Sequence, residues 1–239
     1  MSTRLTQREL VGELMDAPDL DEAVHRQALR GLARLNLVGR SGPMILDAVR
    51  HHFHNHRAHH PLRLLDVACG AGDVTLRLAR GLSRTGLDVA VDGCDLSDTA
   101  LAAARARAAS RSDASPARFF RQDVIDAGVP AGYDIYVLNL FLHHLDNDAA
   151  RTLLARIVAH RPRLVVVGEL ARSWPALIGT CLATRALTRS RIVHVDGLRS
   201  VRAGFTAAEL AELARDAGMA RPRVTHHRPA RLRLVWSAE

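Results

Sequence analysis

Short apolar runs alternate with amphipathic helical stretches over the middle of the chain. The runs that we interpret as buried strands are residues 62–68, 88–94, 117–121, 133–140 and 163–167. Helical patterns lie between them, over residues 73–82, 97–109 and 147–159. Strands that alternate with helices in this way are typical of a parallel sheet covered on both faces. A right-handed crossover at each step makes such a sheet doubly wound.

The first 60 residues show a different pattern. Apolar residues between positions 20 and 49 recur mostly at intervals of three, without the alternation of a strand, so we expect helices here. Asp21 and Ser41 stand where N-terminal caps are expected, and Pro43 suits the first turn of the second helix. We therefore predict a helical cap over residues 1–60, followed by an α/β domain over residues 61–239.

The end of the chain also departs from the strand–helix alternation. Thr206 is a candidate cap for a helix over residues 206–217, and the apolar runs at 223–227 and 231–236 predict a closing hairpin. The predicted fold is Rossmann-like α/β. Its sheet is doubly wound, mostly parallel and seven-stranded, with a C-terminal antiparallel hairpin and an N-terminal helical extension.

The charge of the chain does not by itself indicate a nucleic-acid partner. The formal net charge is +8, but all 33 basic residues are arginine and the chain contains no lysine. Together with the abundance of alanine, this resembles the codon bias of a GC-rich genome. The arginines are also scattered, without a block of five or six in a row. We therefore expect no nucleic-acid partner.

Other features of the whole sequence indicate the cellular compartment of the protein. No apolar stretch is long enough for a membrane span, and the first residues are charged throughout, so we expect no span and no export signal. Cys69, Cys94 and Cys181 are odd in number and widely separated, which suits a reducing compartment. These observations predict a cytoplasmic protein.

The motif that carries most information follows the first predicted strand. It reads Leu-Leu-Asp-Val-Ala-Cys-Gly-Ala-Gly-Asp over residues 64–73, in which Gly70 and Gly72 permit a tight turn and the close approach of a ligand to the backbone. A dinucleotide fingerprint requires a third glycine, but Thr75 follows instead. A phosphate-binding P-loop requires a lysine, which the chain lacks.

This motif resembles that of class I S-adenosylmethionine-dependent methyltransferases, in particular the ubiquinone/menaquinone-biosynthesis type and related small-molecule (polyketide/quinone) enzymes. The resemblance covers roughly residues 62–170 and departs from the family at Ala68, where many members carry glycine. It implies S-adenosyl-L-methionine as the cofactor. The contacts that it implies in the first loop are Asp66, which would help to hold the cofactor's ammonium group, with Ala68, Cys69, Gly70 and Gly72.

The resemblance implies further cofactor contacts at the next three strand ends. After the second strand, Asp95 is preferred to Asp92 as the acid that accepts both ribose hydroxyls, because it lies at the end of the strand. Asp123 is preferred to Asp126 as the acceptor for the adenine amino group. The remaining implied contacts are Leu96 against the adenine, Val124 beside Asp123, and Asn139 and Leu140 at the end of the fourth strand.

Histidines near the same edge are candidate catalytic residues. His143 and His144 follow the fourth strand in a Phe-Leu-His-His-Leu phrase similar to one of the small-molecule enzymes, and His194 lies in residues 173–204, a predicted substrate cover. Histidine titrates near neutral pH and is the usual base for an oxygen nucleophile. Glu169 also points toward the crevice mouth. Transfer by alignment alone, without any base, stays an open alternative.

We expect no metal site. The histidine-rich run at residues 51–60 could bind one through His52 and His56, but it contains no carboxylate or cysteine. The predicted function is methyl transfer to a small, largely apolar acceptor, by O- or C-methylation of a phenolic, quinone-like or polyketide-like metabolite. One alternative is a non-catalytic binding protein that keeps the cofactor fold, with RNA as a candidate partner. Another is a nicotinamide oxidoreductase, which the missing third glycine disfavours. The oligomeric state stays open.

Overall fold

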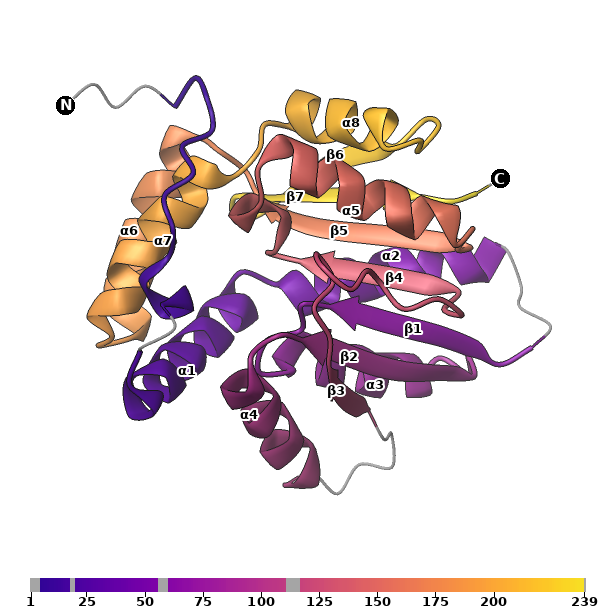
Figure 1. Cartoon of the computed structure of the whole chain (residues 1–239), viewed down its shortest axis with the longest axis horizontal. Coiled ribbons are helices and arrows are strands. Elements are labelled where there is room, and N and C mark those ends of the chain that lie inside the picture. The colour runs from indigo at the N-terminus through magenta and orange to yellow at the C-terminus, as the bar shows by residue number, and fades with distance from the viewer. Residues whose placement is uncertain (1–4, 18–19, 56–59, 111–116, 239) are drawn as a thin grey trace.

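The computed structural model describes residues 5–17, 20–55, 60–110 and 117–238 (Figure 1). Seven strands form one sheet in the order β3-β2-β1-β4-β5-β7-β6. The first five are parallel, whereas β7 runs antiparallel to β5 and to β6. This confirms the predicted fold. The strand bounds are β1 (Leu62–Val67), β2 (Val89–Asp95), β3 (Arg118–Arg121), β4 (Ile135–Asn139), β5 (Leu164–Leu170), β6 (Arg223–His227) and β7 (Arg231–Trp236).

Two strands differ by two residues or more at one end from the ranges that the sequence predicts. The fourth begins at Ile135 rather than at residue 133, and the fifth continues to Leu170 rather than ending at residue 167. All seven residues of β5 are buried, because it is paired with β4 on one side and with β7 on the other. Its pairing with β7 extends from Val165 to Leu170 and supports the longer strand.

Helices cover both faces of the sheet and its carboxyl edge. In Figure 1, α5 and α8 lie over one face, while α2 and α3 lie behind the other. The helices are α1 (Glu22–Val38), α2 (Ser41–Asn55), α3 (Asp73–Ser83), α4 (Asp98–Ala109), α5 (Asn147–Ala159), α6 (Trp174–Leu187), α7 (Arg191–Ala203) and α8 (Ala207–Asp216), with short 3-10 helices η1 (Leu14–Asp16) and η2 (Leu142–His144).

The N-terminal segment that we predicted as a cap occupies two places. On α2, Ile45, Val49 and Phe53 are buried in a core with residues of β1, β4 and β5, so this helix is part of the layer on the sheet. In contrast, α1 and η1 contact α6 and α7 beyond the strand ends (Figure 1). Only this second part of residues 5–55 lies where it can cover a ligand.

The helix starts follow largely from their capping residues. Asp21 accepts hydrogen bonds from the amides of Ala23 and Val24, and Thr206 forms a capping box with Glu209 at the start of α8. The expected cap at Ser41 is wrong, because α2 already includes Ser41 and its buried hydroxyl has no hydrogen-bond partner among the described residues.

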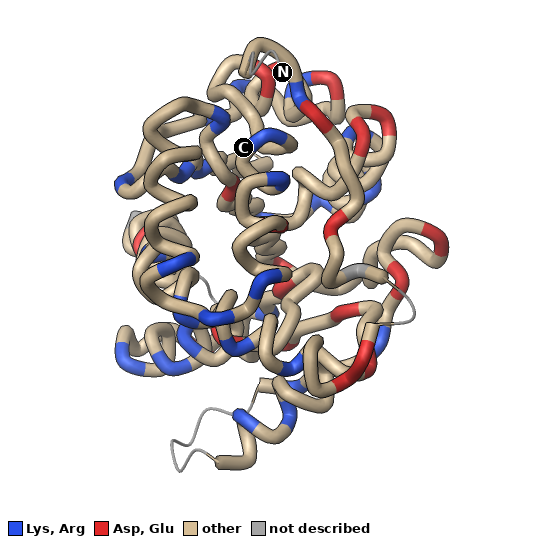
Figure 2. Tube along the Cα trace, turned by 90° about the vertical axis from the view of Figure 1, so that its left-hand side faces the viewer, with Lys and Arg blue, Asp and Glu red and all other residues tan. Residues whose placement is uncertain are grey.

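The surface features agree with the composition. Figure 2 shows the arginines spread over many elements of the side in view rather than gathered on one of them. Within the described part of the chain, no helix has the length and apolar character needed to cross a membrane.

Candidate active site

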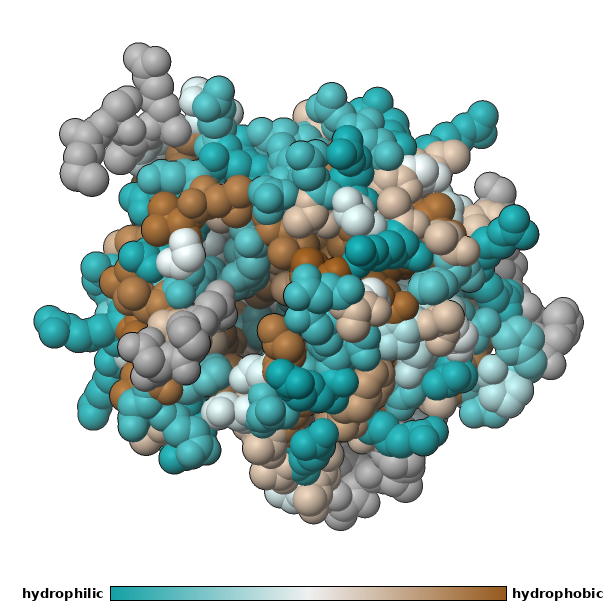
Figure 3. All heavy atoms as spheres, in the orientation of Figure 1, coloured by the Kyte–Doolittle hydropathy of each residue, from teal (hydrophilic) through white to brown (hydrophobic). Residues whose placement is uncertain are grey.

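A cavity of about 1070 Å³ opens at the carboxyl ends of the parallel strands. Doubly wound sheets bind ligands at this edge. The loops after β1, β2 and β4 form one wall, and α1 and α6 contribute to the other. Figure 3 shows the molecule hollowed between these helices and the sheet, with hydrophobic side chains beside the hollow. Apart from Gly72, every predicted cofactor-binding residue lines the cavity.

The loop after β1 follows a backbone path with three left-handed residues. Ala68 has a φ of 55°, Gly70 of 56° and Gly72 of 70°. A side chain at Gly70 would meet no atom within 4 Å, so this glycine leaves open space at the cavity wall. A Cβ at Gly72 would lie 2.8 Å from the ring of Phe119 and 2.9 Å from Ala104. Gly72 therefore allows the helix to pack closely, whereas Gly70 leaves room for a ligand.

Asp95 joins this loop to the end of β2. Its Oδ2 accepts a hydrogen bond from the amide of Gly70 at 2.8 Å, and its Oδ1 accepts one from the amide of Ser97 at 2.9 Å. Ser97 itself caps α4, which leaves Asp95 at the cavity wall. Leu96 is 52% exposed and offers an apolar surface beside it.

Asp66 lies deeper, at the end of β1. Its carboxylate is buried and accepts a hydrogen bond of 2.6 Å from the hydroxyl of Thr75. Burial raises the pKa of Asp66 to about 7, against the lowering effect of the Thr75 hydrogen bond, and the charges of Asp73 and Asp95 raise it further. A cationic group bound in the cavity near Asp66 would favour its ionised form.

The other predicted contacts complete the wall. Asp123 Oδ1 accepts hydrogen bonds from the amides of Ile125 and Asp126 at 3.0 and 2.9 Å, and Val124 is buried beside it. Asn139 Oδ1 is buried and has no hydrogen-bond partner among the described residues. Leu140, at a φ of 56°, turns the chain away from β4. Asp126 does not line the cavity, in keeping with the preference for Asp123.

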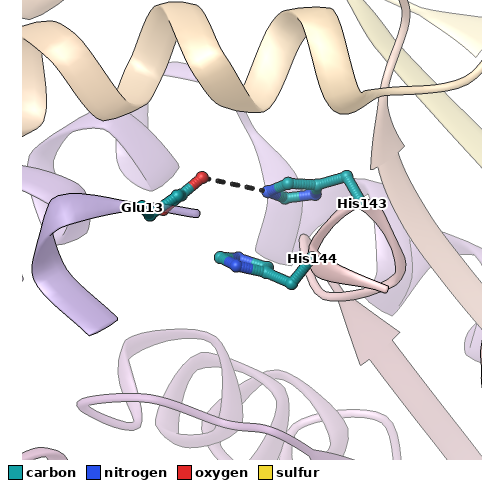
Figure 4. A group of neighbouring side chains, drawn as sticks. All are labelled: Glu13, His143 and His144. Carbon is teal, nitrogen blue, oxygen red and sulfur yellow. Dashed lines mark ion pairs between the residues drawn. The ribbon is translucent and has the colours of Figure 1, made fainter. Parts of the chain in front are cut away.

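His143 lies between two carboxylates, of which Figure 4 shows that of Glu13. Nδ1 of His143 is 2.8 Å from Glu169 Oε2, and its Nε2 is 3.7 Å from Glu13 Oε1. Burial alone disfavours a charged imidazole, but the carboxylates of Glu169 and Glu13 outweigh burial and raise the pKa of His143 to about 9. His144 lies on the cavity wall, its ring 4.4 Å from that of His143 between centroids.

The third histidine is placed elsewhere. His194 does not line the cavity, and its Nε2 lies 2.9 Å from the carbonyl oxygen of Thr188. The structure therefore brings His143 and His144 together without His194. Of the histidine-rich run, His56 lies outside the described residues.

The charged residues at the cavity that the sequence did not predict include Glu13 and Arg231. Glu13 precedes η1, and Arg231 begins β7, far from every motif in the sequence. Burial lowers the pKa of Arg231 to about 10, although Glu169 acts in the opposite direction. No local pattern could reveal either residue, because both reach the site through tertiary packing.

Comparison with known proteins agrees with this geometry. Residues 64–161 match the family model described as "Methyltransferase domain". A Nostoc punctiforme structure described as a candidate O-methyltransferase is 19% identical with a TM-score of 0.63, covering 96% of this chain and 64% of its own length. The Synechocystis magnesium protoporphyrin IX methyltransferase, solved with bound S-adenosylhomocysteine, is 16% identical with a TM-score of 0.55, over 94% of this chain and 91% of its own.

Human N-acetylserotonin methyltransferase, in complex with S-adenosylmethionine, is 15% identical with a TM-score of 0.62 over 92% of this chain and 59% of its own. The chain therefore spans about two thirds or less of the Nostoc and human proteins. No curated protein sequence matches it. The match of residues 64–161 to a methyltransferase domain and the order of the sheet agree with the fold that the resemblance to class I S-adenosylmethionine-dependent methyltransferases implied.

Proposed function

We propose that the protein transfers a methyl group from S-adenosyl-L-methionine to a small, largely apolar acceptor, by O- or C-methylation of a phenolic, quinone-like or polyketide-like molecule. One observation carries this proposal. The bond between Asp95 and Gly70 joins an acid and a glycine turn on one wall of a cavity that continues between α1 and α6. The cavity is large for a ligand site, which supports a nucleoside cofactor and an acceptor side by side.

The residues present fit this cofactor. Each carboxylate oxygen of Asp95 accepts a backbone hydrogen bond, and a carboxylate oxygen can accept more than one, which suits an acid that also binds a ribose hydroxyl. Asn139 lines the cavity at the end of β4. Asp66 supplies an acid for an ammonium group, and Gly70 leaves the backbone open to close approach.

When bound, the cofactor supplies a methyl group on a positively charged sulfur. The contribution of the chain is to align the acceptor with that group and to exclude water. Leu29 and Leu32 of α1 and Ala176 and Ala183 of α6 line the cavity with apolar surface. We propose that α6 and α7, within the predicted cover at residues 173–204, hold the acceptor there.

The acceptor proton has two possible fates in this site. His144 lies on the cavity wall and is not enclosed as His143 is, so we favour His144 as the base in the metal-free protein where an oxygen is methylated. His143 is held in its charged form by Glu169 and Glu13, which makes it a poorer proton acceptor in the protein without added metal. A C-methylation or an acidic acceptor needs no base, and alignment then suffices.

A methyl-donor assay tests the proposal. We expect labelled S-adenosylmethionine to give a methylated product with at least one member of a panel of phenols, quinones and pyrones, identified by mass. Calorimetric titration with S-adenosylhomocysteine, done on the same preparation, should show one site per chain. Cofactor binding without any methylated product across the panel would favour a non-catalytic protein. Absence of cofactor binding would refute the proposed function itself.

A further inference from the structure

Within the described residues, one group of side chains has the composition of a metal site. A carboxylate oxygen of Glu13 and one ring nitrogen each of His143 and His144 all lie within 4.8 Å of one another (Figure 4). All three residues line the cavity. We propose that they bind a divalent transition-metal ion of the zinc type at the acceptor side of the cavity.

The donor set is chemically suited to such an ion. Two imidazoles and one carboxylate are ligands that zinc and its first-row neighbours accept, with metal–ligand distances of about 2.0–2.2 Å. Donor atoms around one ion then stand roughly 3–3.5 Å apart, so this trio, whose donor atoms lie within 4.8 Å of one another, has to close by up to about 1.5 Å. His144 is exposed and lies in the short helix η2, where a rotation of its side chain can supply that movement.

The second coordination shell is already in place. Nδ1 of His143 lies 2.8 Å from the carboxylate of Glu169, which is fully buried, so Nε2 is directed toward Glu13. A carboxylate behind a metal-binding histidine fixes the ring and its tautomer. Glu169 is held in turn by the amides of Phe141 and Leu170, at 2.9 and 3.1 Å.

The backbone around the proposed ligands is fixed as well. Asp196 of α7 accepts hydrogen bonds from the amides of Leu14 and Met15, immediately after Glu13. Arg8 donates to the carbonyl oxygens of Leu142 and Leu145, on either side of the histidine pair. These bonds tie the N-terminal segment to α7 and to the segment of the histidine pair, which lie 134–182 residues away in sequence, and they bring the three ligands to one place.

Charge and access favour a divalent cation. Glu13 and Glu169 place two carboxylates against His143, and an ion of charge +2 that displaces the imidazolium proton to solvent balances both. Three protein ligands leave coordination positions open toward the cavity. If the proposed methyl transfer is correct, an oxygen of the acceptor fills one of them and is thereby oriented. The metal site itself does not depend on that function.

The spacing of residues along the chain does not reveal this metal site, which corrects the expectation of none. Glu13 stands far from the histidine pair along the chain and bears no relation to it in spacing. The histidine-rich run, which spacing does reveal, can chelate metal by itself, so the test has to separate the two. We define the run variant as the chain with His51, His52, His54, His56, His59 and His60 each replaced by glutamine.

The experiment uses the full chain without an affinity tag, treated with chelator and titrated with Zn²⁺ by calorimetry and with Co²⁺ by visible absorption. In the run variant we expect one site per chain, with the cobalt bands of a nitrogen–oxygen site. In that background, Glu13→Gln, His143→Ala and His144→Ala should each weaken binding at least tenfold. His25→Ala is the matched control, because His25 lines the same cavity outside the trio and should leave affinity unchanged.

Several results would overturn the proposal. These are no binding in the run variant, unchanged affinity in His144→Ala, or an equal loss in His25→Ala. Because His143 is buried, circular dichroism and thermal unfolding in chelator show whether each variant is folded, and the exposed His144 provides the decisive variant if His143→Ala is not. S-adenosylhomocysteine titration of the same samples keeps the two proposals apart, since cofactor binding can fail while the metal site persists, and the reverse.

Discussion

The carboxylate of Asp95 accepts a hydrogen bond from the amide of Gly70 across 2.8 Å, and so ties the end of β2 to the loop after β1. The two residues are 25 positions apart, yet they form one unit of the cavity wall. Because parallel strands end at the same edge of the sheet, an acid after one strand can order the turn after its neighbour. The acid thus shapes the loop even before a cofactor occupies the cavity.

Asp95→Ala should weaken cofactor binding about tenfold or more, because it removes charge-assisted hydrogen bonds to the ribose and the bond that orders Gly70. Calorimetric titration with S-adenosylhomocysteine measures the change. The matched control is Asp98→Ala, three residues later, since Asp98 is exposed and does not line the cavity. An affinity that is unchanged in Asp95→Ala would place the ribose site elsewhere.

Two glycine substitutions should separate packing from ligand approach. Gly72→Ala places a Cβ 2.8 Å from the Phe119 ring at a positive φ, so we expect a loss of about 2 kcal/mol or more in the free energy of unfolding. Gly70→Ala meets no atom and should cost only about 1 kcal/mol of backbone strain. Cofactor affinity should nevertheless fall more in Gly70→Ala. Denaturant unfolding measures the stability of the two variants, and calorimetry measures their affinity for the cofactor. A larger loss of stability in Gly70→Ala, or a larger loss of affinity in Gly72→Ala, would contradict these separate roles.

Asp66 should make both stability and cofactor binding depend on pH. Its pKa is raised to about 7 in the folded protein from an ordinary value of 3.8, so the native state holds the proton more tightly than the unfolded chain. Its contribution to stability is therefore complete below about pH 4 and declines as the pH rises toward 7. Asp66→Asn removes this decline and should raise the free energy of unfolding at pH 8 by roughly 1–3 kcal/mol.

The same variant should bind the cofactor less well, because only the ionised carboxylate attracts an ammonium group. Wild-type affinity for S-adenosylhomocysteine should fall as the pH is lowered from 7.5 to about 5.5, a window in which an amino group stays charged. In Asp66→Asn the affinity should be lower at pH 7.5 and nearly flat with pH. A wild-type slope that survives in the variant would assign the titration to another group.

The sheet was predictable because its signals are local. Apolar runs and helical periodicity each reflect one element, and the capping of α1 by Asp21 and of α8 by Thr206 depends on residues within a few positions. The end of β5 was not predictable. It reaches Leu170 beside β7, a strand from the far end of the chain. Local hydrophobicity does not report such pairing.

The cavity wall also combines residues that local sequence signals reveal with residues that only tertiary packing brings there. Residues such as Asp66 and Asp95 could be named from the sequence, because a strand end places them at the binding edge. Ala68 shows that the turn tolerates alanine in a left-handed conformation, where glycine is more usual. Glu13 could not be found, since hydrogen bonds between the N-terminal segment, α7 and η2 bring it to the histidine pair.

Arg8 should contribute more than any exposed ion pair to holding the N-terminal segment against the rest of the protein. The guanidinium of Arg8 donates to the carbonyl oxygens of Ala203 and Leu145, each at 2.8 Å, and stacks 3.9 Å from the centre of the Phe205 ring. Hydrogen bonds from a charged group contribute about 1.5–3 kcal/mol, so Arg8→Ala should lower the free energy of unfolding by about 2–4 kcal/mol.

Limited proteolysis followed by mass spectrometry should then show faster cleavage of Arg8→Ala within residues 9–13. The segment of the variant opens more easily, because the hydrogen bonds of Arg8 no longer have to be broken. Arg202→Ala is the matched control. Arg202 pairs at 4.0 Å with Glu9, whose side chain is 66% exposed, and such a pair contributes about 0–1 kcal/mol. Equal cleavage rates in the two variants would mean that the segment is held by its apolar contacts instead. In that case the affinity for zinc should be unchanged in Arg8→Ala. If Arg8 does anchor the segment, the affinity for zinc should fall, because Glu13 is no longer held beside the histidine pair.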